Sequence, residues 1–345
     1  MAALIDTELD RILRGVSRSI FLTLKVAPRR TRRQLAVGYL FCRAADTIAD
    51  TRLVSVARRQ ELLGTFRDQF TPASQRDGAA TELAAALDSP QAVPEEYELL
   101  ARLGDCFSAL EALEPGDQER IHHLVRTLTQ GMALDLARFP PEESGELRAL
   151  ESDRELDDYT YYVAGCVGEF WTELHAAHLP ALRHWVVDDM RQRGKRFGQG
   201  LQFTNILRDV RADLEIGRCY FPAPALTAAG LTLEDLRAHR APVRSRELFH
   251  RYLRVALGHY QEGWSYTLAI PRRLPRLRLA CAWPLLLGLR TLALLHASPD
   301  PYAPGSHHKV TRSEVRSILR RSALRVGSNR GLERLYRELA AGLPR

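Results

Sequence analysis

Lysine is almost absent from this chain of 345 residues, although the chain is basic. The lysines are Lys25, Lys195 and Lys309, so arginine supplies nearly all of the positive charge, and the formal net charge is +7 at pH 7. A surface rich in arginine can bind anionic lipid, nucleic acid or a phosphorylated ligand. The surplus can equally be an effect of codon composition. Dense basic runs with interleaved aromatic residues are missing, so we expect no nucleic-acid partner.

Paired cysteines, an export signal and long apolar runs are missing as well. The five cysteines are scattered and lack Cys-x-x-Cys spacing, which argues against a disulfide framework and a zinc site. Residues 1–6 turn acidic without an apolar signal core, so we expect a cytoplasmic location. The most apolar stretch, 279–289, contains Pro284 and is shorter than the roughly 20 residues that span a bilayer. It predicts a buried helix, at most near a peripheral membrane contact.

Strand and repeat signals are nearly absent too. Ala, Leu, Arg and Glu dominate, and apolar residues recur every three or four positions. We therefore predict an all-α protein in which residues 1–345 form a single domain. We expect helices over 6–16, from Pro28 through Asp50, over 54–70, 157–168, 201–214, 245–270 and 279–295, from a capping box at Thr311, and over 332–341. We expect loops at 71–80, 140–145 and 298–305, and a turn between helices at Pro115-Gly116.

One row of polar side chains dominates the chain. Asn205, Asp209 and Asp213 repeat at i, i+4 and i+8, which is one face of an α-helix. The residues around them are largely apolar: Leu201, Phe203, Ile206, Leu207, Val210 and Leu214. We expect this helix to be buried, and a buried carboxylate row needs a cation. Mg²⁺ commonly combines one or two carboxylates with substrate phosphate.

A second row occurs much earlier, where Tyr39, Arg43, Asp46 and Asp50 also share one helical face. Two such rows facing each other would hold metal ions with a polyanion between them, and the simplest polyanion is a diphosphate. The alternative is that each row is a solvated helix face, which is the usual meaning of a single Asp-x-x-x-Asp. Two pairs with adjacent arginines and apolar flanks favour the site.

Three further features have two interpretations each. Ser17-Arg18-Ser19 suits a phosphate contact, or a helix cap. Gly165 and Gly168 leave room for a neighbouring helix or for a ligand. Tyr159 could place its phenol in a cavity, or it could be a buried tyrosine that satisfies its own hydrogen bond.

These motifs together resemble the squalene/phytoene synthase family, and most of all its bacterial squalene synthases. The similarity runs over about residues 15–295, in order and separation. It rests on Ser17-Arg18-Ser19, 39–50, 159–168 and 202–213, followed by Gly217-Arg218 and Pro222. It implies an isoprenoid-synthase helical bundle around a deep central cavity, Mg²⁺, and a prenyl diphosphate substrate.

The resemblance also implies residue roles. Metal binding falls to Asp46, Asp50, Asn205, Asp209 and Asp213. Substrate binding falls to Ser17, Arg18, Ser19, Arg43, Gln202, Asn205, Arg208 and Arg218. The catalytic residues would be Tyr159, Tyr39, Arg43 and Arg208. Mg²⁺ and arginine would neutralise the leaving diphosphate, while a dry cavity and tyrosine rings would protect a carbocation. Ala49 and Ala212 depart from the squalene-type motifs, which often carry Glu there, and Ile20 stands where an aromatic residue is usual.

The product depends on the extension at about 306–341. Lys309 and Arg312 resemble the basic segment that binds a nicotinamide cofactor in squalene synthases, although a basic helix start would look the same. Without Gly-x-Gly-x-x-Gly, NADPH would bind outside a Rossmann unit. We expect two farnesyl diphosphates to give presqualene diphosphate and then squalene. The alternatives are phytoene, dehydrosqualene or presqualene diphosphate as the final product, and a non-enzymatic scaffold. We infer no obligate protein partner.

Overall fold

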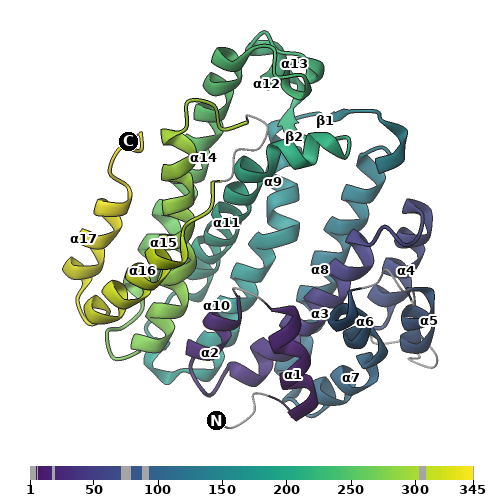
Figure 1. Cartoon of the computed structure of the whole chain (residues 1–345). Coiled ribbons are helices and arrows are strands. Elements are labelled where there is room, and N and C mark those ends of the chain that lie inside the picture. Colours follow the sequence, from purple (N-terminus) through teal and green to yellow (C-terminus); the bar gives the residue numbers. More distant parts are fainter. Residues whose placement is uncertain are drawn as a thin grey trace. The chain divides into compact units, whose positions relative to one another are not determined.

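The computed structural model describes residues 5, 7–17, 20–70, 79–87, 93–302 and 308–344. Their contacts divide the chain into two compact units. Unit 1 comprises residues 1–137 and 170–183, and unit 2 comprises residues 138–169 and 184–345. Helices dominate both units (Figure 1), which confirms the predicted all-α class. The single domain stays a prediction.

Unit 1 is built mainly from the N-terminal helices, drawn in purple and blue in Figure 1, together with a later segment drawn in teal. They are α1 (Thr7–Val16), α2 (Ile20–Val26), α3 (Arg32–Asp50), α4 (Val56–Asp68), α5 (Ala79–Ala86), α6 (Pro94–Ala101), α7 (Leu103–Glu111), α8 (Pro115–Arg138), most of α10 (Cys166–His178) and the 3₁₀ turn η3 (Pro180–Leu182). Pro115 begins α8, so the predicted turn at Pro115-Gly116 is wrong. Proline fits the first helical position because its missing N–H would have no partner there.

The core of unit 1 forms around α3, which is buried along most of its length. Phe41 of α3 packs edge-on against Phe70, with ring centroids 4.9 Å apart, and it also packs against Phe107 at 4.9 Å. Each aromatic pair adds about 0.5–1.5 kcal/mol beyond its area burial. The packing therefore fixes the helix that carries the predicted row of Tyr39, Arg43, Asp46 and Asp50.

A buried hydrogen-bond chain fixes the start of α3. The His175 ring donates from Nδ1 to the carbonyl oxygen of Trp171 (2.7 Å), which leaves Nε2 to accept from Thr31 Oγ1 (3.2 Å). Burial lowers the pKa of His175 to about 4, so the ring is neutral at pH 7. Thr31 immediately precedes α3.

Unit 2 holds the remaining elements. They are the 3₁₀ turn η1 (Glu142–Ser144), β1 (Arg148–Leu150), α9 (Asp153–Thr160), the π-helix η2 (Tyr161–Gly165), the start of α10, α11 (Val187–Glu215), β2 (Arg218–Pro222), α12 (Ala223–Ala228), α13 (Leu233–Arg237), α14 (Pro242–Ala269), α15 (Pro275–Ala297), α16 (Arg312–Arg325) and α17 (Asn329–Leu339). The 29-residue α11 packs against α14, α15 and η2. The capping box predicted at Thr311 is confirmed at the start of α16.

The two short strands pair in parallel, with Arg148 opposite Arg218. The sequence predicts only the end of a helix at this point. Gly217 makes the turn between α11 and β2 at φ 85°, and a side chain there would meet the carbonyl oxygen of Glu146 at 2.5 Å. The strand thus carries Arg218 and Tyr220 back beside the C-terminal part of α11.

The predicted helix at 157–168 is divided into α9, η2 and α10. Its glycines meet α11 closely. A Cβ on Gly168 would lie 1.8 Å from the Gly194 carbonyl oxygen, and one on Gly198 would lie 2.1 Å from the Ala164 carbonyl oxygen. Of the two interpretations of these small residues, the structure supports a neighbouring helix.

Helix α15 extends beyond the predicted 279–295. Over Pro275–Ala297 it is long and apolar enough to cross a membrane by length and composition, and 50% of the apolar window is buried within the protein. A core helix passes the same test. Among the described residues, no second helix does so.

Candidate functional site

The α3 row lies in unit 1, with Tyr39, Arg43, Asp46 and Asp50 on consecutive turns. The Tyr39 hydroxyl donates to the carbonyl oxygen of Val16 (3.2 Å), at the end of α1. Arg43 lies 3.7 Å from Asp46 and forms an ion pair with Glu96 of α6. The row is therefore bound to two neighbouring helices before any ligand is added.

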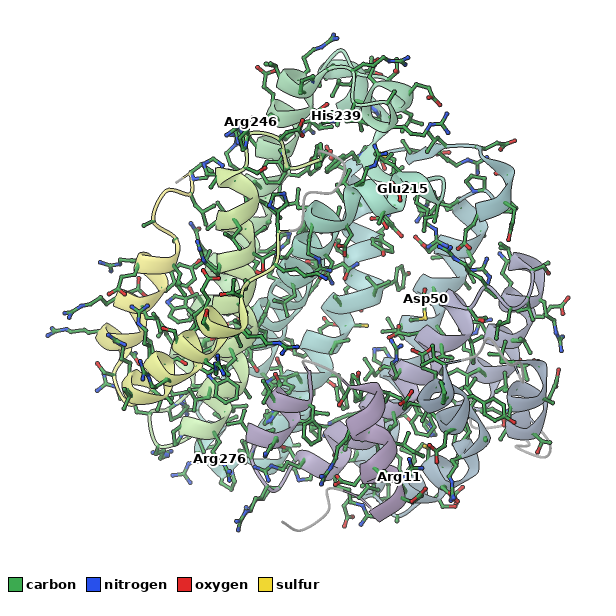
Figure 2. The ribbon with its side chains drawn as sticks, in the orientation of Figure 1. Arg11, Asp50, Glu215, His239, Arg246 and Arg276 are labelled. Carbon is green, nitrogen blue, oxygen red and sulfur yellow. The ribbon has the colours of Figure 1, made fainter. Side chains whose placement is uncertain are left out.

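Asp46 and Asp50 fit a cation. The pKa of Asp46 is raised to about 7, first by desolvation and second by the charge of Asp50, while Arg43 opposes the shift. The Asp46 side chain nevertheless remains 41% exposed, so a cation can reach it. Asp50, labelled in Figure 2, ends the helix and is exposed. A divalent ion would relieve the repulsion between the two carboxylates.

The Ser17-Arg18-Ser19 motif is described in part. Ser17 directly follows α1, and its backbone N–H donates to the Leu13 carbonyl oxygen at 3.0 Å. Its hydroxyl is buried, with no hydrogen-bond partner within the described residues. A buried hydroxyl gains from an acceptor, as a phosphate oxygen would be. Arg18 and Ser19 lie outside the described residues.

The α11 row lies in unit 2 and is more open than predicted. Asn205 is exposed and the Asp209 side chain is 42% exposed, whereas Phe203, Ile206 and Leu207 are buried. The prediction of a buried row is wrong, because the apolar residues between the polar ones face other sides of the helix. The row itself remains accessible to a ligand.

Hydrogen bonds connect the start of this row to Tyr159. Gln202 Nε2 donates to the Tyr159 hydroxyl (3.3 Å), and Asn205 Nδ2 donates to Gln202 Oε1 (3.2 Å). The Tyr159 ring stacks on Tyr220 of β2, with centroids 4.4 Å apart and planes inclined by 23°. Tyr220 in turn meets the edge of Phe139 at 5.3 Å. An aromatic wall therefore lies beside the polar row.

The two predicted substrate-binding arginines of unit 2, Arg208 and Arg218, each contact a carboxylate. Arg208 binds Asp209 through two hydrogen bonds of 2.8 and 2.5 Å, and this pairing raises the pKa of Arg208. Arg218 lies 3.4 Å from Glu142 and over the Phe139 ring. A diphosphate at Arg208 and a metal at Asp209 would separate that pair.

Asp213 and Arg218 line one small pocket of unit 2. The other residues around it are Ile206, Val210, Cys219, Tyr220 and Phe221. Burial raises the pKa of Cys219 to about 12, so the thiol is protonated at pH 7. The pocket therefore offers one carboxylate and one guanidinium among apolar walls.

Each row presents two carboxylates that could bind a metal ion. Within each unit, the described residues include no group of three His, Cys, Asp or Glu side chains around one point. This ligand set fits Mg²⁺, which retains water and takes substrate phosphate oxygens as further ligands. The two rows belong to different units, and their convergence on one substrate stays a prediction.

The predicted cofactor residues lie at the start of α16. Lys309 and Arg312 are exposed. Glu314 accepts two hydrogen bonds from Arg290 (2.9 and 2.7 Å) and caps Thr311. These bonds lower the pKa of Glu314 to about 2, first through the Thr311 backbone N–H. The helix start is thus capped and tied to Arg290 of α15, and the two cations add to the positive end of the helix dipole.

Sequence reasoning missed Glu96, Glu142 and Tyr220. The only sequence signal for Glu96 is its place just after Pro94, in an acidic first helical turn. Glu142 falls in the predicted loop 140–145. Tyr220 reaches Tyr159 through the strand pairing that the sequence did not predict.

Comparison with known proteins gives the family. The squalene/phytoene synthase family model matches residues 13–316. Squalene synthase 1 of Arabidopsis thaliana is 27% identical over 83% of this chain and 64% of its own length. The 15-cis-phytoene synthase of a Paracoccus species is 28% identical over 88% of this chain and 86% of its own length. The bifunctional lycopene cyclase/phytoene synthase of Blakeslea trispora is 31% identical over 61% of this chain, which spans only 31% of that protein.

The fold has a counterpart among solved structures. A structure titled as a complex of TcSQS with a ligand matches with a TM-score of 0.78 at 24% identity. The match covers 98% of this chain and 93% of the other, so the C-terminal helices are part of the shared fold. The protein is a member of the squalene/phytoene synthase family.

Proposed function

We propose that the protein joins two farnesyl diphosphates head to head in a Mg²⁺-dependent reaction, and then reduces presqualene diphosphate to squalene with NADPH. One observation supports the proposed condensation step. Each of two helices that bury an apolar face presents an Asp-x-x-x-Asp pair with an arginine beside it: Asp46 and Asp50 on α3, and Asp209 and Asp213 on α11.

One set of residues would bind the diphosphate of the substrate, and another set would surround its prenyl group. Arg43, Arg208 and Arg218 would bind the diphosphate together with the Ser17 hydroxyl, because guanidinium groups match phosphate oxygens geometrically. Bound at the aspartates, Mg²⁺ would neutralise the leaving group. The stacked rings of Tyr159 and Tyr220 would face the carbocation, since an aromatic face attracts a cation.

The departures from the squalene-type motifs leave the aspartates in place. Ala49 is buried, whereas Ala212 is exposed beside the row. Both motifs keep two carboxylates, one helical turn apart. Mg²⁺ commonly takes one or two carboxylates from a protein, so each motif retains enough of them. We therefore expect metal-dependent turnover despite the two alanines.

The reductive step depends on the start of α16. Lys309 and Arg312 are exposed cations at a capped helix N-terminus, a suitable environment for the phosphates of NADPH. The Paracoccus phytoene synthase is as similar in sequence as the Arabidopsis squalene synthase. A non-reducing product is therefore the second candidate, either phytoene or dehydrosqualene, or presqualene diphosphate itself.

One incubation separates these products. Purified protein is given Mg²⁺ with farnesyl or geranylgeranyl diphosphate, with and without NADPH, and the products are identified by mass spectrometry. We expect presqualene diphosphate without NADPH and squalene with it. The same hydrocarbon under both conditions would exclude the reductive step. No turnover with either substrate would favour the scaffold alternative.

We also propose a cytoplasmic protein with a peripheral membrane contact, because squalene partitions into lipid. Half of the apolar window of α15 is not buried within the protein. Cell fractionation tests the location. We expect activity in the membrane fraction that high salt or mild detergent releases, and recovery of all activity as soluble protein without lipid dependence would contradict the contact.

A further inference from the structure

Glu96 binds Arg43 within unit 1. The carboxylate of Glu96, in the first turn of α6, accepts a hydrogen bond from Nη2 of Arg43 on α3. The Arg43 side chain is 24% exposed and that of Glu96 is 20% exposed. Partial burial strengthens this ion pair relative to a surface pair, because less water screens the charges.

Helix α6, which carries Glu96, is anchored to α1. It begins with Pro94, and the acidic side chains of its first turn complement the positive end of the helix dipole. On the other side, Glu98 of α6 forms an ion pair with Arg11 of α1. The side chain of Glu95 lies against Gly15 of α1. Glu96 is thus presented by a helix that contacts α1 as well as α3.

The pairing leaves part of the Arg43 guanidinium available. Arginine has five N–H donors in one plane. Glu96 engages Nη2, while Nη1 lies 3.7 Å from Asp46 in the α3 row. The planar group is therefore held with one edge on Glu96 and the other toward the row. An arginine held in this way loses less side-chain entropy when it binds phosphate.

We propose that Glu96 is a positioning residue: it orients Arg43 so that the guanidinium presents Nη1 to a diphosphate bound at the α3 carboxylate row. The inference rests on the proposed function, which makes Arg43 a diphosphate ligand. Glu96 acts through Arg43 and does not itself touch the substrate.

Isothermal titration of the full chain with inorganic pyrophosphate and Mg²⁺ tests this role without turnover. Glu96→Ala should weaken pyrophosphate binding about tenfold. Glu96→Asp keeps the charge but is one methylene shorter, so it should also weaken binding. Glu96→Gln, whose amide oxygen can still accept from Nη2, should stay within about threefold of the parent. The matched control is Glu98→Ala, which removes an ion pair from the same helix and should leave binding unchanged.

A double-mutant cycle separates positioning from general support of the fold. In an Arg43→Ala background, Glu96→Ala should have no further effect on pyrophosphate binding, because it acts only through Arg43. A structural role would weaken binding equally in both backgrounds and would overturn the inference. Tighter binding by Glu96→Ala would also overturn it, since Glu96 would then compete with the anion.

The same titration separates this inference from the proposed function. If Arg43→Ala weakens binding while Glu96→Ala does not, the positioning role of Glu96 is wrong and the site stands. If Arg43→Ala itself leaves binding unchanged, Arg43 is no diphosphate ligand, and both assignments are wrong.

Discussion

Replacing Gly168 by alanine should damage both the fold of unit 2 and the site. A methyl group on Gly168 would lie 1.8 Å from the Gly194 carbonyl oxygen, where real contacts stay above 3.0 Å. The start of α10 would have to move about 1 Å away from α11. Overpacking typically costs 1–3 kcal/mol, and here the obstacle is backbone, so we expect a loss of about 3 kcal/mol or more in the free energy of unfolding.

This movement should also displace Tyr159, one of the proposed catalytic residues. Tyr159 precedes Gly168 on the same helical segment, and its hydroxyl lies 3.3 Å from Gln202 of α11. A shift of this size would break that hydrogen bond, so we expect turnover to fall even at temperatures where the variant stays folded. Urea unfolding followed by circular dichroism measures the first effect, and product formation from farnesyl diphosphate measures the second.

Gly258→Ala is the matched control in the same unit. Gly258 lies inside α14, and a Cβ there would meet no atom within 4 Å. Alanine should stabilise that helix by about 0.5–1 kcal/mol, because glycine loses more backbone entropy. A Gly168→Ala protein as stable and as active as the parent would refute the steric argument.

Three further predictions concern pH, metal and cofactor. Burial lowers the pKa of His175 to about 4, so unit 1 should be fully stabilised above pH 6.5 and should lose about 3 kcal/mol as the pH falls from 6.5 to 4. Denaturant unfolding across this range measures the loss, and an equal slope in His175→Gln would contradict it. Asp209→Asn should lower Mg²⁺-dependent turnover at least about 100-fold with an unchanged melting temperature, and wild-type kinetics would exclude Asp209 as a ligand. Lys309→Glu with Arg312→Glu should abolish the response to NADPH while presqualene diphosphate still forms; a retained response would place the cofactor elsewhere.

The sequence was sufficient to predict those features of the structure that depend on residues close together in the chain. The helical period placed Asp46 and Asp50 on one face of α3, and the capping box located the start of α16 at Thr311. These features depend on neighbours within one or two turns. Helix spacing also placed Asp209 and Asp213 in one row, and the structure keeps that row.

The sequence was insufficient to predict those features that depend on contacts between segments far apart in the chain. Strand β2 forms because residues 148–150 pair with it across a long separation, and that pairing brings Tyr220 to Tyr159. Glu96 likewise reaches Arg43 from a separate helix. Periodicity overestimated the burial of the α11 row, because it counts apolar neighbours without showing which side each one faces.

The wide turn of η2 lets one continuous helical stretch contact α11 at two places. An α-helix advances by about 100° per residue, so one extra residue in a π-turn resets the phase of everything beyond it. Before η2, that phase points Tyr159 toward Gln202, and after η2 it points Gly168 toward the backbone of Gly194. Deleting a single residue from Tyr161–Gly165 would close the wide turn into a regular α-helix and change the angle between the faces that carry Tyr159 and Gly168, so the length of this one turn sets how the whole segment meets α11.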